Sequence, residues 1–161
     1  MKTFLAVFFG ILAAVAVILM LAGLVNLWQS REKAKQVEQH IRVLRMRVIA
    51  TACITYQSTY GGYPETLAQL GPGPGGVGSF TAEHGGLIDE VLASGKVGGY
   101  TFTYSPTKRD RRRHVTGYNV SATRDRSDGP YIYNFFVDQT GVIRSTLENR
   151  PATSTDQPII D

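Results

Sequence analysis

Metal-binding and nucleophilic side chains are scarce in this chain of 161 residues. Its single cysteine, Cys53, excludes an intrachain disulfide and sits among small apolar residues, which is typical of a core position. The histidines His40, His84 and His114 lie too far apart for the spacing of a metal-ligand motif. We therefore predict a protein that is not an enzyme and has no catalytic residues, no cofactor, no bound metal and no small-molecule substrate.

Charge is missing from the start of the chain. Residues 4–28 contain no charged side chain, and most of them are large and apolar. Roughly 25 helical residues extend about 37 Å, enough to cross a bilayer core of about 30 Å. A cleaved secretory signal would be shorter, and a buried core helix would be apolar along one stripe only. We predict a retained single-pass anchor over residues 1–30, with the lipid bilayer as its first partner.

Glycine and proline are absent from residues 33–60, which predicts that the helix continues through residues 31–60. Apolar residues recur there at three- and four-residue steps, as in one stripe of an amphipathic helix. We predict that this stripe packs against a sheet, and the interpretation of the whole chain depends on that contact. The residues of the predicted packing stripe are Val37, Ile41, Leu44, Val48 and Ala52.

The sequence period changes from helical to alternating at Tyr100. Residues 61–99 are rich in glycine and proline and are predicted to form an irregular connector. Over residues 100–148 apolar and polar side chains alternate, which predicts a four-stranded antiparallel sheet with one buried face. Residues 149–161 are rich in proline, serine and threonine and are predicted to be a flexible C-terminal tail. The predicted fold class is α+β, with a long helix covering one sheet.

Four segments, in this order, resemble type IV pilin-like proteins and the pseudopilins of type II secretion. They are ITYQSTYGGYP (54–64), GLIDEVLASG (86–95), GYTFTY (99–104) and FVDQTGVIR (136–144). The resemblance implies a pilin-like α+β domain over residues 31–148 behind an N-terminal anchor. It also implies a structural subunit of a pilus or a type II secretion-type assembly. Such a subunit would sit in the bacterial inner membrane with a periplasmic C-terminal domain. It would pack its N-terminal helix against other pilin-like or secretion-system subunits.

The start of the chain departs from that family in one respect. Prepilins carry a glycine at the cleavage site and a glutamate five residues after it, whereas here Gly10 is followed by Ile11, and Val15 stands where glutamate would be. The departure predicts an unprocessed anchor and argues against ordinary filament assembly. Two features of the sequence disagree about the side of the membrane on which the C-terminal domain lies. Basic residues after the anchor favour a cytoplasmic domain, whereas the resemblance implies a periplasmic one.

A cluster of cations falls in one predicted hairpin loop, formed by Lys108, Arg109, Arg111, Arg112 and Arg113. These side chains are candidates for binding an anion, either nucleic acid or an acidic lipid headgroup, while a plain solvated loop is the ordinary alternative. Two classes of function follow. The first is the structural subunit described above. The second is a stand-alone single-pass protein that displays a pilin-like domain to DNA or another anionic partner through this basic hairpin.

Overall fold

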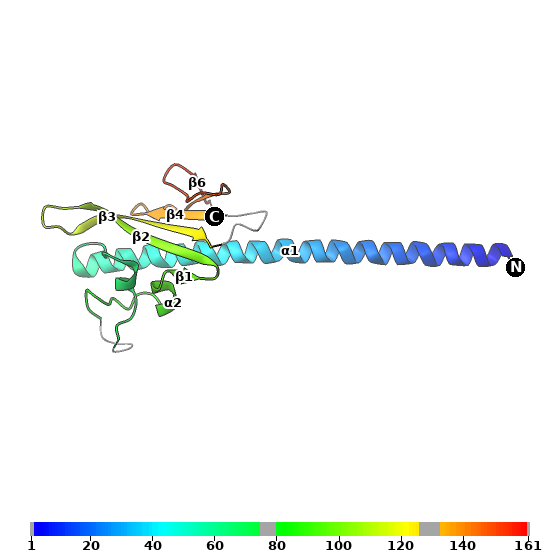
Figure 1. Cartoon of the computed structure of the whole chain (residues 1–161), viewed down its shortest axis with the longest axis horizontal. Helices are drawn as coiled ribbons and strands as arrows, with labels where there is room; N and C mark the ends of the chain where they lie inside the picture. The colour runs from blue at the N-terminus through cyan, green and yellow to red at the C-terminus, as the bar shows by residue number, and fades with distance from the viewer. Residues whose placement is uncertain (1, 75–79, 126–132, 161) are drawn as a thin grey trace. The chain divides into compact units, whose positions relative to one another are not determined.

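The computed structural model describes residues 2–74, 80–125 and 133–160, with the side chains of residues 2–16, 32 and 34–39 left out. Its described residues form an α+β structure with an antiparallel sheet, as predicted (Figure 1). The chain divides into two compact units, residues 1–40 and 41–161.

The described residues of the first unit all belong to helix α1 (Lys2–Tyr60), which continues into the second unit. Large apolar side chains between Val17 and Trp28 are exposed. Among the described residues, no helix combines the length and the apolar character needed to cross a bilayer. The side chains of residues 1–16 lie outside the described part of the chain, so the anchor over residues 1–30 stays a prediction.

The C-terminal part of α1 buries one face in the core of the second unit. Its side chains recur at three- and four-residue steps, so they share one side of the helix. The buried residues of this face are Val43, Met46, Ile49, Ala50, Cys53 and Tyr56. They join the inner face of the sheet in a single apolar cluster. In addition, the Arg42 guanidinium lies 4.3 Å from the centre of the Tyr100 ring, a cation–π contact between helix and sheet.

The sheet is a meander in which every strand pairs with its neighbour in the sequence, and all pairs are antiparallel. Its strands are β1 (Lys96–Val97), β2 (Tyr100–Arg109), β3 (Val115–Arg124), β4 (Asn134–Asp138), β5 (Arg144–Thr146) and β6 (Gln157–Pro158). The sequence predicted four strands, whereas the described residues form six. The two additional strands, β1 and β6, are each two residues long, too short to show an alternating pattern.

Strand register sorts the side chains into an apolar inner face and a polar outer face. Phe102 lies opposite Ala122 and Val120 opposite Val137, and all four side chains are buried. Residues one step along each strand point to the other face, because side chains alternate across a pleated strand. The alternation within residues 100–124 and 134–137 therefore predicted the buried face correctly.

The connector is tied to the core by tyrosine hydroxyls. It contains the 3₁₀ helix η1 (Leu67–Leu70) and the short helix α2 (Glu90–Ala93). The hydroxyl of Tyr104 donates a hydrogen bond of 2.7 Å to the carbonyl oxygen of Pro64, and that of Tyr56 one of 2.5 Å to the carbonyl of Ala82. These bonds fix an otherwise irregular segment against the helix and the sheet.

The described part of the C-terminal segment belongs to the fold, so the prediction of a flexible tail over residues 149–161 was wrong for residues 149–160. Strand β6 pairs with β5, and the Ile159 amide donates to the Ile143 carbonyl oxygen at 2.9 Å. Asp156 accepts two hydrogen bonds from Arg150, at 2.6 and 2.8 Å. Ala152 is buried. Composition suggested disorder, but the ion pair and the edge pairing bring this segment back onto the sheet.

Candidate functional site

The stripe predicted to pack on the sheet is largely exposed. The exposed fractions are 41% for Ile41, 43% for Leu44 and 46% for Val48, whereas Ala52 is buried at 4%. The side chain of Val37 lies outside the described part of the chain. For Ile41, Leu44 and Val48 the predicted contact with the sheet was therefore wrong, while Ala52 does contribute to the core.

The error has a geometric cause. Two residues along a helix correspond to about 200° of rotation, so Leu44 and Met46, or Val48 and Ala50, point to nearly opposite sides. Helix α1 therefore carries two apolar stripes, and the sheet takes the one that contains Met46 and Ala50. The more aliphatic stripe, which the sequence favoured, remains at the surface.

A shallow groove runs along this exposed side of the helix. It encloses about 300 Å³, and Leu87 of the connector forms part of its wall beside Leu44 and Val48. The remaining lining residues are Arg47, Thr51, Ala52 and Thr55. A groove whose lining combines aliphatic residues with threonine and arginine can accept the apolar side of another helix. We call residues Ile41, Leu44 and Val48 the exposed helical face.

The predicted basic cluster lies around the tip of the β2–β3 hairpin. The Asp110 carboxylate organises this tip, because its Oδ1 accepts hydrogen bonds from the backbone amides of Arg112 (2.8 Å) and His114 (2.9 Å). Arg113 has a φ of 70°, which closes the turn in the left-handed region. The turn leaves Lys108 and Arg111 exposed, together with Arg112 and Arg113.

Arg109 has a different role from the other cations of the cluster. Its guanidinium donates two hydrogen bonds to the Glu65 carboxylate, at 2.5 and 2.6 Å, and one to the carbonyl oxygen of Arg113 at 3.2 Å. These bonds hold the pKa of the Glu65 carboxyl below its usual range. The pair ties the connector to the hairpin. No local sequence pattern predicts this pair, because its partners lie 44 residues apart.

Comparisons with protein-family models, with curated proteins and with solved structures found no match.

Proposed function

We propose that this protein is a membrane-anchored, pilin-like or pseudopilin-like structural subunit of a pilus or type II secretion-type assembly. It acts there by packing its helix against the apolar helix of a neighbouring pilin-like subunit. The proposal no longer rests on the packing stripe contacting the sheet, since that contact is absent for Ile41, Leu44 and Val48. It rests on one observation, an aliphatic stripe at the surface of a helix whose opposite side already covers the sheet.

The exposed helical face is suited to a second helix. Ile41, Leu44 and Val48 follow the three- and four-residue spacing of a helix–helix seam. Complete burial of such a side chain contributes about 1.5–3 kcal/mol, so hiding the exposed half of all three contributes roughly 2–4 kcal/mol. A seam of this size is weak by itself. It becomes effective when the membrane holds both helices side by side.

The first unit supports attachment to a membrane. Its exposed apolar side chains between Val17 and Trp28 occupy successive positions, so they point to every side of the helix. Water solvates such a surface poorly, whereas the lipid tails of a bilayer solvate it well. We propose a bacterial inner-membrane location with the C-terminal domain in the periplasm.

Thiol labelling tests this sidedness. Val142→Cys would place a reactive thiol in the exposed β4–β5 turn, while the native Cys53 is completely buried. Labelling by a membrane-impermeant maleimide in intact spheroplasts is expected. Protection until lysis would place the domain in the cytoplasm.

Charge substitutions in the exposed helical face test assembly. Leu44→Glu combined with Val48→Glu should abolish co-purification with pilin-like or secretion-system subunits, because a carboxylate would be buried in the seam. Val91→Glu is the control, since Val91 is an exposed aliphatic residue, at 57%, on α2 of the same domain. Unchanged co-purification in the double variant would contradict the proposal.

A second candidate function is display of the basic hairpin to an anionic partner such as DNA. The observation that favours it is the Asp110 turn, which presents Arg111 and Arg112 together at the tip. Replacing both arginines with glutamine should weaken binding of duplex DNA and lower its salt dependence. Identical binding and salt dependence in the variant would exclude the hairpin as a site.

A further inference from the structure

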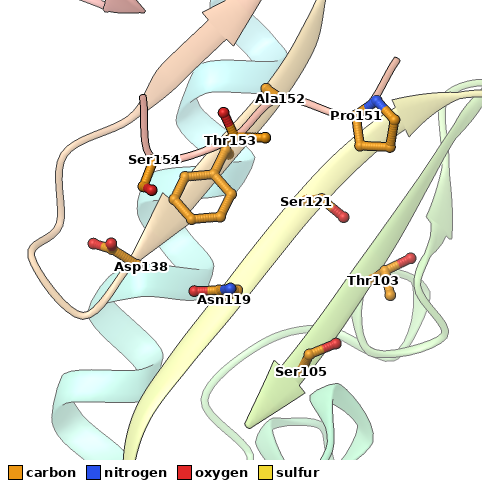
Figure 2. Close-up of a pocket in the computed structure, with 10 residues that line it drawn as sticks. Thr103, Ser105, Asn119, Ser121, Asp138, Pro151, Ala152, Thr153 and Ser154 are labelled. Carbon is orange, nitrogen blue, oxygen red and sulfur yellow. The ribbon is translucent and has the colours of Figure 1, made fainter. Parts of the chain in front are cut away.

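The outer face of the sheet carries a pocket of about 380 Å³ that the assembly role does not use. Its floor is a grid of side chains set by the strand register. One row crosses β2, β3 and β4 as Ser105, Asn119 and Asp138, and the next as Thr103, Ser121 and Phe136. Figure 2 shows the labelled side chains of these strands below the segment 151–154. The volume falls in the range of small-molecule sites, about 300–1,000 Å³.

The C-terminal segment forms one wall of the pocket and is held firmly. Asp156 is paired with Arg150 and also accepts a hydrogen bond of 2.7 Å from the Thr153 amide. The amide nitrogen of buried Asn134 donates to the carbonyl oxygen of Arg150 at 2.7 Å. Phe136 lines the same pocket and is only 7% exposed, although it lies on the polar face. The wall is therefore fixed before any ligand arrives, which lowers the entropic cost of binding.

The floor offers hydrogen-bonding groups that the fold does not use. Within the described part of the chain, the side chains of Thr103, Ser105, Asn119 and Ser121 make no hydrogen bond. Asp138 uses Oδ1 for the β4–β5 turn, where it accepts from the Thr140 amide and hydroxyl, and its Oδ2 has no partner among the described residues. Hydroxyl and amide groups that can both donate and accept are thus gathered on one small surface.

This lining selects a class of ligand. Among the described residues that line it there is no lysine, arginine or histidine, and the one charged side chain is the Asp138 carboxylate, so the lining disfavours anions. Pro151, which is exposed, supplies apolar surface beside the polar groups, while Phe136 and Ala152 contribute little because they are nearly buried. Neutral sugars present the matching combination of hydroxyl groups and apolar C–H faces. We propose that this pocket is a binding site for an uncharged saccharide, a function that does not depend on the assembly role.

Saturation-transfer NMR with the full-length protein tests the proposal. The detergent should be a phosphocholine, since a maltoside would itself be a saccharide ligand. The probes are maltose and N,N′-diacetylchitobiose, with glucuronate as the anionic comparison. We expect a saturable signal for at least one neutral probe and a weaker one for glucuronate, which Asp138 would repel.

Two valine substitutions on the same strand and the same face supply the matched variants. Ser121→Val removes a hydroxyl from the centre of the floor and should weaken binding at least about tenfold, a loss of roughly 1.4 kcal/mol. Thr123→Val lies two residues along β3, outside the pocket, and should leave affinity unchanged. The proposal is overturned if neither neutral probe gives a saturable signal, or if both variants bind as the natural protein does.

Discussion

Replacing Ile49 and its neighbour Val48 by alanine tests which side of helix α1 belongs to the core. Ile49 is completely buried in the cluster with the sheet, whereas Val48 is 46% exposed. Both are β-branched residues in the same helical turn, so alanine changes their helix propensity by similar small amounts. The pair therefore isolates burial from backbone effects.

The magnitudes follow from burial. Ile49→Ala removes about three carbon groups from a packed site, which costs roughly 2.4 kcal/mol in transfer free energy before the cavity left behind is counted. We expect a total loss of about 2–4 kcal/mol in the free energy of unfolding. Val48→Ala removes about two groups that are half solvated, and the gain in helix propensity offsets part of the loss. We expect a change within about 0.5 kcal/mol.

Urea unfolding of the full-length protein in detergent, followed by the near-ultraviolet circular dichroism of its tyrosines, provides the assay. With a denaturant slope of about 2 kcal/mol/M, Ile49→Ala should lower the midpoint by roughly 1–2 M and Val48→Ala by less than about 0.3 M. Equal shifts, or a larger shift for Val48→Ala, would refute the assignment of the two faces.

Further predictions concern a thiol, an ion pair and a buried amide. Burial raises the pKa of the Cys53 thiol to about 12, so a maleimide at pH 8 should modify it only in the unfolded protein; rapid labelling of the folded chain would contradict its burial. Arg109 lowers the pKa of Glu65, so the pair stabilises the fold above the ordinary carboxyl pKa of about 4.3, and this contribution is lost as pH falls through the lower folded value. In the Glu65→Gln variant the melting temperature should therefore fall slightly less steeply as the pH is lowered, and only at low salt. An unchanged dependence of melting temperature on pH at low salt would argue against the pair. Asn134→Ala should cost about 1–3 kcal/mol in thermal or urea unfolding, because three backbone groups lose hydrogen bonds to its side chain; a loss below about 0.5 kcal/mol would show that water replaces them.

The local pattern predicted the central strands well, for a physical reason. In Tyr100 to Tyr104 the aromatic side chains alternate with threonines, and one face of a strand can be buried only if its residues share that period. The structure buries Tyr100 and Phe102 on the face predicted from this alternation. In the turn between β4 and β5, Gly141 adopts a φ of 73°, a conformation that glycine allows without steric cost.

The helix and the C-terminal segment needed information that the pattern does not contain. A helix with two apolar sides has two consistent choices of core face, and only the shape of the sheet decides between Leu44 and Met46. The C-terminal segment is held by the Arg150–Asp156 pair and by pairing with β5, contacts that composition does not reveal. The outer-face pocket depends on that segment, so its polar floor looked like an ordinary solvated face in the sequence.

Site-specific photo-cross-linking at Val48 in native membranes tests the proposed assembly role most directly. A benzophenone side chain at this position would lie in the exposed helical face, and the same group at Val91 would serve as the control. The proposal predicts an adduct from Val48, absent from Val91, that mass spectrometry identifies as linked to the helix of a pilin-like subunit. No adduct, or adducts of equal yield from both positions, would contradict it.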